Sequence, residues 1–326
     1  MSTPITGLHH VTALAGPPQR NVDFHVGTLG LRLVKRTVNF DAPDVYHLYY
    51  GDRVGSPGSI LTFFPFPMAA AGQFGVGESI ATAFAVPTGA VEAWMDRFAD
   101  LGSIGSVDFD APTERFGQRV LAFRDADGMP FELVETVGLT AEANEAERVW
   151  TDGPIDTGSA IRRFHSVTLL VDRPADTAQV LTDVFGYAEG ATEGRRTRFT
   201  VAGEGAVHID LLTPDRVTPR GRSGHGTTHH IAFRTPDDET QATVREQLMS
   251  LGLGVTTVQD RNYFRSIYFR EPSGVLFEVA TDPPGFLIDE DLATLGTALK
   301  LPAQYEPRRA RLEASLPPLA DPVVAA

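Results

Sequence analysis

The chain has no cysteine among its 326 residues. This absence excludes disulfides, thiolate nucleophiles, zinc fingers and iron–sulfur clusters, and it leaves histidine, aspartate and glutamate as the strong metal ligands. Positive charge is also scarce, because 28 lysines and arginines stand against 42 acidic residues, for a formal net charge of −14. This surplus of negative charge would repel a polyanion, so we expect no nucleic acid partner.

Long hydrophobic runs are missing as well. With 42% hydrophobic and 21% charged residues, the composition is typical of a soluble globular protein, and no membrane span is predicted. The first residues, MSTPITGLHHV, contain neither the basic nor the apolar segment of a signal peptide, so a cytoplasmic location is expected. The length fits about two domains of ordinary size.

What the sequence does contain is an internal repeat. The segments FRDADGMPFELVE, from Phe123, and FREPSGVLFEVAT, from Phe269, share the pattern F-R-[D/E]-x-x-G-x-x-F-E. A second pair, LHHVTALA from Leu8 and FHSVTLLV from Phe164, links the two halves of the chain. Each half therefore carries two units, and each unit fits a strand, one amphipathic helix such as VEAWMDRFADLG, and three strands. We predict an α+β fold of four βαβββ modules.

The repeat also predicts where the chain divides. The segment TAEANEAERVWTDGPIDTGSA, residues 140–160, is acidic and alanine-rich and then rich in glycine and proline, as linkers are. We therefore predict one pair of modules in residues 1–150 and a second pair, followed by a C-terminal tail, in residues 151–326. The tail, after about residue 283, is proline-rich with a helical patch and is expected to wrap over the surface.

Over nearly its whole length the chain resembles the vicinal-oxygen-chelate superfamily, whose βαβββ modules pair into open, cup-shaped mixed sheets with helices outside and a metal in the cup. More narrowly, it is similar to the ring-cleaving dioxygenases that act on hydroquinones. The matching segments are LHHVT, VKRTVNFDAPDVYHLYYGD, ERFGQR, FHSVT, HHIAF, GVLFE and GFLIDEDLATLG. The resemblance implies two such sheets in this chain.

The repeats serve as internal controls for locating a metal in such a cup. Setting HHVT on HSVT aligns His9 with His165 and His10 with Ser166. The first histidine of the doublet therefore persists in the other copy, whereas the second is lost. This difference favours His10 as the ligand.

The second doublet gives the same kind of contrast. Setting HHIAFRTP on IATAFAVP aligns His230 with Ala81, while a glutamate remains in both copies, as Glu278 and Glu132. Strand alternation places the candidate ligands on the face with small or polar neighbours, opposite the apolar face. One cup thus keeps a complete ligand set, which consists of His10, His230 and Glu278.

Two histidines and one carboxylate with open positions form the facial triad of non-haem Fe(II) oxygenases, although Mn(II) suits the same ligands. Glyoxalases of the superfamily typically add a carboxylate or an amide from the fourth strand of a module. In SILTFFPF that position falls at Thr62 or Phe63, and neither is a usual fourth ligand. The metal would then keep sites for substrate and dioxygen.

The resemblance also implies catalytic roles for His9, His229, Arg261 and Tyr268. The two histidines would hydrogen-bond around the ligands, Arg261 would supply charge and hydrogen bonds, and Tyr268 would contact a substrate oxygen. Substrate binding would fall to Thr12, Tyr268 and Arg261. Alternation points His9 and His229 away from the cup, unless a bulge or twist at the strand start turns them round.

Glu132 lacks the histidines that accompany Glu278. Because a buried, unpaired carboxylate costs several kcal/mol, we expect Glu132 to be solvated or paired with an arginine, with Arg119 and Arg124 as candidates. The remaining histidines receive no role; they are His25, His47, His208 and His225.

These features predict an enzyme, an extradiol-type ring-cleaving dioxygenase that uses non-haem Fe(II) and O2 to open a hydroquinone-like or catechol-like ring. Its partners would be a small aromatic substrate and O2, with association into a homo-oligomer left open. The alternatives are a glyoxalase-type metal-dependent isomerase or lyase, and a non-catalytic protein that binds an aromatic drug in the cup, as bleomycin-resistance proteins do.

Overall fold

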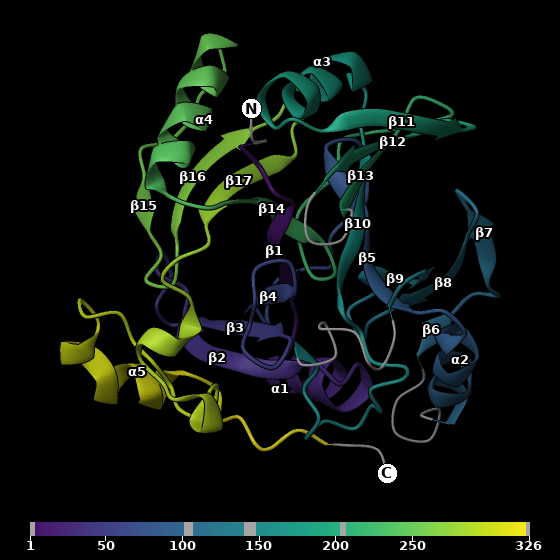
Figure 1. The fold of residues 1–326 in the computed structure, drawn as a ribbon. Coiled ribbons are helices and arrows are strands. Elements are labelled where there is room, and N and C mark those ends of the chain that lie inside the picture. The colour runs from purple at the N-terminus through teal and green to yellow at the C-terminus, as the bar shows by residue number, and fades with distance from the viewer. Residues whose placement is uncertain (1–3, 101–106, 140–147, 203–206, 324–326) are drawn as a thin grey trace.

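Four similar modules make up the computed structural model, which describes residues 4–100, 107–139, 148–202 and 207–323 (Figure 1). The first module comprises β1 (Leu8–Ala15), α1 (Pro18–Val22) with its π-helical continuation η1 (Asp23–Thr28), β2 (Arg32–Val38), β3 (Tyr46–Gly51) and β4 (Ile60–Pro65). The second comprises β5 (Glu78–Pro87), α2 (Ala90–Asp100), β6 (Asp108–Phe109), β7 (Thr113–Arg115), β8 (Gln118–Arg124) and β9 (Pro130–Thr136).

The second half of the chain repeats this order. The third module comprises β10 (Arg163–Leu170), α3 (Pro174–Gln179) continued by η4 (Val180–Val184), β11 (Ala188–Glu193), β12 (Arg196–Val201) and β13 (Val207–Leu212). The fourth comprises β14 (Thr228–Thr235), α4 (Asp238–Ser250), β15 (Gln259–Asp260), β16 (Arg265–Arg270) and β17 (Leu276–Thr281). Short helices follow in the tail: η5 (Phe286–Ile288), η6 (Leu292–Thr294), η7 (Glu306–Arg308) and α5 (Arg309–Ser315).

Two mixed sheets combine the modules in crossed pairs. The eight-stranded sheet, in the order β15-β16-β17-β14-β1-β4-β3-β2, joins the fourth module to the first. The nine-stranded sheet, in the order β11-β12-β13-β10-β5-β9-β8-β6 with β7 beside β8, joins the third module to the second. The predicted α+β class and its four modules are confirmed.

The crossed pairing bears on the predicted halves of the chain. Each sheet takes one module from residues 1–150 and one from residues 151–326, so these halves divide the sequence and not the sheets. Whether they behave as two domains stays a prediction. Of the expected linker, residues 140–147 lie outside the described part of the chain.

Amphipathic sequences place the helices against the sheets. Val91, Trp94 and Phe98 are buried along one side of α2 at helical spacing. The helix α4 begins after Asp237, whose carboxylate accepts a hydrogen bond from the Thr240 backbone N–H at 2.8 Å. Helices α2, α3 and α4 lie at the periphery of the molecule, outside the sheets (Figure 1). No helix within the described ranges has both the length and the apolarity needed to cross a membrane.

The two central strands of the eight-stranded sheet are each interrupted by a β-bulge at the histidine doublet. Between Leu8 and His10, β1 advances two residues while β14 advances one, so His9 is the extra residue. In the same way β14 advances two residues against one of β1 at His229. The nine-stranded sheet has matching shifts where β10 pairs with β5. Because a bulge re-aims the side chains beside it, strict alternation does not apply at either doublet.

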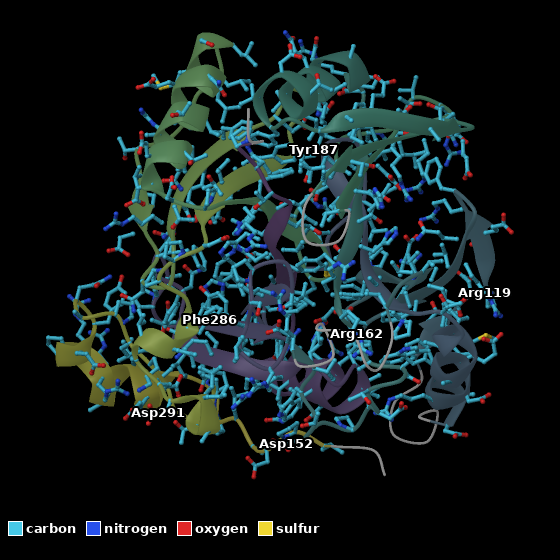
Figure 2. All side chains as sticks on the ribbon, viewed as in Figure 1. Arg119, Asp152, Arg162, Tyr187, Phe286 and Asp291 are labelled. Atoms are coloured by element: carbon cyan, nitrogen blue, oxygen red, sulfur yellow. The ribbon has the colours of Figure 1, made fainter. Side chains whose placement is uncertain are left out.

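The C-terminal tail, which was predicted only to wrap over the surface, packs against the first module. The Phe286 ring of the tail, labelled in Figure 2, meets the Tyr49 ring of β3 at a centroid distance of 5.1 Å. Lys35 of β2 is fully buried, and its ammonium group binds Asp289 at 2.6 Å and also Glu290. The tail is therefore tied to the sheet by both apolar contact and buried charge.

Candidate metal centre and its cavity

Three neighbouring strands bring the predicted ligands together. His10 lies on β1, His230 on β14 and Glu278 on β17, and all three are buried. The Nε2 atoms of the two histidines are 3.2 Å apart. The Glu278 Oε2 atom lies 3.3 Å from the His10 Nε2 atom and 2.9 Å from the His230 Nε2 atom.

Glu278 is ionised in this setting. Burial alone would raise its pKa, but the two facing histidines hold the pKa of Glu278 well below its usual range. Its Oε1 atom accepts a hydrogen bond from the Ser266 hydroxyl. The Oε2 atom is left to face the two imidazoles, and no hydrogen bond with good geometry satisfies it.

These donors fit a metal ion. Two imidazole nitrogens and one carboxylate oxygen, all within 4.8 Å of one another, converge on one buried point. A divalent cation would satisfy all three at once, and nitrogen and oxygen donors of this kind suit Fe(II) or Mn(II). The geometry agrees with the predicted ligand set, and metal binding itself stays a prediction.

The first histidine of each doublet holds the second. The Nδ1 atoms of His9 and His10 are 2.9 Å apart, and those of His229 and His230 are 2.8 Å apart. Each outer histidine thus occupies the Nδ1 side of its neighbour and leaves the Nε2 atom turned to the centre. His165, the counterpart of His9, makes the equivalent contact from its Nδ1 atom to the Ser166 hydroxyl at 3.0 Å.

The roles expected for His9 and His229 need to be separated. His229 lines the cavity above the candidate centre, where a direct catalytic role is open to it. His9 is buried behind the wall, 4.9 Å from the Phe264 ring between centroids, and is absent from the cavity lining. The bulge turns the His9 ring toward His10 and not into the cavity, which agrees with the hydrogen-bonding role expected for His9, and its part in catalysis stays a prediction.

The cavity has a volume of about 290 Å³. Arg261 and Tyr268 both line it, and the Arg261 Nε–H donates to the Tyr268 hydroxyl oxygen at 3.0 Å. Burial raises the pKa of Tyr268, so the tyrosine keeps its proton. Four apolar side chains also line it: Phe40, Phe64, Phe264 and Leu276.

A chain of hydrogen bonds that the sequence analysis missed crosses the cavity floor. The Tyr49 hydroxyl lies 2.8 Å from the His47 Nδ1 atom, and the His47 Nε2 atom lies 2.8 Å from the Thr62 hydroxyl. The Thr62 hydroxyl is in turn hydrogen-bonded to the Thr12 hydroxyl, with the two oxygens 2.8 Å apart. Burial raises the pKa of Tyr49 and lowers that of His47, so both are neutral near pH 7.

Two residues of this chain lie differently from what the sequence indicated. His47 received no role from the sequence, yet it lines the cavity together with Tyr49. Thr12, expected to bind substrate, is fully buried and absent from the lining, because its hydroxyl turns to Thr62. The signal that could have found His47 and Tyr49 was their two-residue spacing on β3, which places both on one face of the strand.

The second sheet neutralises its glutamate with an arginine. The Arg115 Nη1 atom donates to the Glu132 Oε2 atom at 2.6 Å. The prediction of an arginine partner is thus confirmed, but the candidates Arg119 and Arg124 were wrong. Arg119 points outward beside α2 (Figure 2), where it binds Glu92, and Arg124 lies 3.9 Å from the Asp108 carboxylate.

Known proteins with similar sequences match nearly the entire chain. The protein MhqO of Bacillus subtilis (strain 168), which is provisionally assigned as a ring-cleaving dioxygenase, is 45% identical to this chain over 98% of both chains. A chlorohydroquinone/hydroquinone 1,2-dioxygenase of Sphingobium indicum is 34% identical over 93% of both. A crystal structure of a provisionally assigned dioxygenase from Bacillus subtilis subsp. subtilis str. 168 superposes with a TM-score of 0.90 at 44% identity, covering 98% of this chain and 99% of that one.

A family model covers both halves of the chain. The model of the Glyoxalase/Bleomycin resistance protein/Dioxygenase superfamily matches residues 7–133 and 163–279, which include nearly all of the four modules. The expected resemblance is therefore confirmed, and the chain belongs to the Glyoxalase/Bleomycin resistance protein/Dioxygenase superfamily.

Proposed function

We propose that this protein is a ring-cleaving dioxygenase that uses Fe(II), held by His10, His230 and Glu278, to open a hydroquinone-like aromatic ring with O2. The observation that carries the proposal is the buried, ionised Glu278 facing two imidazole nitrogens at the edge of an aromatic-lined cavity. A bound ferrous ion would supply the electron transfer between the ring and dioxygen that the side chains cannot supply.

The side chains would orient the ring and control its protons. Since Arg261 donates to the oxygen of Tyr268, the hydroxyl proton of Tyr268 is free to be donated into the cavity. Tyr268 would then hydrogen-bond a substrate oxygen, and the Arg261 charge would stabilise negative charge that develops there. The apolar wall would hold the ring by its faces and exclude water.

The site of cleavage follows from the same arrangement. A ring held by one oxygen at the centre presents the adjacent ring carbon to dioxygen, so we propose extradiol-type cleavage beside the hydroxyl-bearing carbon. The name of the Sphingobium indicum relative, a chlorohydroquinone/hydroquinone 1,2-dioxygenase, supports both the substrate class and this bond.

The glyoxalase-type alternative has less support at the fourth ligand position. Thr62 stands there, and its hydroxyl is already bonded to both His47 and Thr12. No further carboxylate or imidazole within the described residues joins the group formed by His10, His230 and Glu278. Open positions for substrate and dioxygen favour oxygen chemistry.

The test combines metal analysis with oxygen uptake. Protein purified without oxygen should contain about one iron per chain, and it should consume dioxygen when hydroquinone or methylhydroquinone is added. Catechol and a glutathione hemithioacetal serve as comparison substrates in the same assay. Metal-free protein that binds these aromatics without consuming oxygen would contradict the proposal, and so would isomerisation of the thiol adduct without oxygen uptake. Manganese in place of iron, with uptake retained, would overturn only the choice of metal.

A further inference from the structure

We propose that Tyr49 and His47 recognise the substrate hydroxyl at the end of the ring away from the candidate metal centre, and so favour para-dihydroxy rings over catechols. The inference rests on the proposed function, because it takes His10, His230 and Glu278 as the place where one ring oxygen binds. It assigns a specificity-determining role to two side chains of β3 to which the sequence analysis gave no role.

The topology places this pair on the opposite side of the centre from Arg261 and Tyr268. The candidate ligands lie on β1, β14 and β17, whereas Tyr268 lies on β16 and Tyr49 on β3. The strand β16 borders β17 on one side, and β4 separates β3 from β1 on the other, which at about 4.8 Å per strand puts β3 roughly 10 Å from β1. A ring held at the centre therefore has polar side chains at both ends.

The hydrogen bonds of Tyr49 leave it able to bind a ligand. A tyrosine hydroxyl has one donor and acceptor capacity besides, and His47 takes one of these through its Nδ1 atom. Thr62 occupies the other ring nitrogen of His47, so the imidazole cannot turn away. Tyr49 thus presents a fixed hydroxyl with one position remaining, and it lines the cavity.

The nine-stranded sheet allows a comparison, because it has a row of residues at the positions equivalent to Tyr49 and its cross-strand neighbours. Tyr49 pairs in register with Thr62, Thr62 with Thr12, and Thr12 with His230. The corresponding row in the nine-stranded sheet is Arg198, Asp210, Thr168 and Ala81.

In that row the polar groups bind one another. Arg198 grips the Asp210 carboxylate with two hydrogen bonds, of 2.8 and 2.9 Å, and Arg196, at the position of His47, binds Thr168 and Asp210. Both arginines are thus bonded to groups of their own sheet. In the eight-stranded sheet a neutral pair open to the cavity stands in their place.

Ring chemistry turns this difference into selectivity. The two oxygens of a catechol are adjacent, so both lie at the metal end and neither reaches β3. The two oxygens of a hydroquinone are at opposite ends of the ring, so the second one needs a hydrogen-bonding partner away from the metal. Phenol offers the first oxygen alone and isolates the contribution of the second.

The experiment measures anaerobic dissociation constants of the iron-loaded protein for hydroquinone, phenol and catechol, so that no turnover occurs. Wild-type protein should bind hydroquinone about tenfold more tightly than phenol, the value of one well-placed hydrogen bond. Tyr49→Phe should bring this ratio close to one while catechol binding stays unchanged. The matched control is Tyr50→Phe, because the Tyr50 hydroxyl is equally buried but bonds Asn21 at 2.9 Å, away from the cavity. His47→Leu, which removes the partner of the Tyr49 hydroxyl, should lower the ratio in the same direction.

The outcomes separate this inference from the proposed function. A hydroquinone preference that survives in both Tyr49→Phe and His47→Leu overturns the role of β3, whatever the activity of the enzyme. Equal loss in Tyr49→Phe and Tyr50→Phe also overturns it, since it would indicate general damage to the strand. Wild-type protein that shows the preference but consumes no oxygen contradicts the dioxygenase assignment and leaves the recognition by Tyr49 intact.

Discussion

At the scale of single residues, the two histidines of each doublet lie in different settings: the second faces the candidate metal centre, and the first contacts the Nδ1 atom of the second. For His10 to offer its Nε2 lone pair to a metal, its proton must lie on Nδ1, where His9 accepts it. A fixed tautomer and ring orientation strengthen a metal ligand, which is why groups behind ligands matter for affinity. His165 makes the equivalent contact to the residue that follows it, so β1 and β10 share this contact.

Substitution of His9 by phenylalanine tests the holding role. His9→Phe keeps a buried ring beside Phe264 but removes the hydrogen bond to His10, so the affinity for Fe(II) should fall by about 10- to 100-fold. Competition with a chelator of known affinity measures the change. His165→Phe is the matched control in the other sheet and should leave the iron affinity unaltered; equal affinity in the two variants would contradict the positioning role of His9.

The sequence indicated the candidate ligands and, through the resemblance, Arg261 and Tyr268 of the cavity wall, but not the side chains of β3. His10 and Glu278 could be found because a second copy of each module showed which positions had changed. The histidine and tyrosine of β3 were missed because YHLYYG resembles an ordinary buried strand, and only its pairing with β4 shows which side chains face the cavity. Thr12 was placed on the correct strand face, yet Thr62 captures its hydroxyl, and such a contact depends on register between strands.

At the scale of strands and turns, equivalent elements of the two sheets hold residues of the same type whose hydrogen-bond partners differ. Arg115 and Arg261 hold equivalent positions, and each is followed by a non-glycine residue with positive φ, Phe116 at 50° and Asn262 at 70°. In the eight-stranded sheet, Arg261 donates a hydrogen bond to the Tyr268 hydroxyl oxygen. Ala122 pairs with Glu132 at the position where Tyr268 pairs with Glu278, so Arg115 binds the glutamate directly.

The two glutamates therefore respond differently to the same change. Glu278→Gln should abolish iron retention, since it removes the charged ligand. Glu132→Gln should retain iron and cost about 1–3 kcal/mol of unfolding free energy, because the partly buried Arg115 loses its charged partner. Iron content after gel filtration and urea denaturation curves measure the two effects. Comparable iron loss from Glu132→Gln would show that the metal centre has been assigned to the wrong sheet.

The order of elements was predictable from the repeats, whereas the bulges and the crossed pairing were not. Repeated patterns such as FRDADGMPFE and FREPSGVLFE indicate modules because each unit repeats its own local periodicity. Which modules share a sheet depends on the antiparallel contact of β1 with β14, which lie more than two hundred residues apart. Local sequence carries little information about such a contact. The comparison of the repeated modules indicated it only indirectly, because it assigned His10 and His230 to the same ligand set.

At the scale of the whole molecule, the tail connects the outer surface to the cavity. The Tyr305 hydroxyl donates to the backbone carbonyl of Phe40, at 2.7 Å, and Phe40 lines the cavity. Phe286 packs against Tyr49 from behind. The tail thus supports two parts of the cavity wall, and its attachment should affect the affinity for substrate.

Substitution of Lys35 removes the ion pairs that attach the tail to the sheet. Lys35→Met leaves the buried Glu290 without its cation, so we expect a loss of about 3–5 kcal/mol in unfolding free energy and weaker anaerobic binding of hydroquinone, because Phe286 no longer supports Tyr49. Urea denaturation and hydroquinone titration measure these changes. Arg311→Met, which removes an exposed cation from the helix α5, should alter neither. Unchanged hydroquinone affinity in a destabilised Lys35→Met protein would show that the tail stabilises the fold without supporting the cavity.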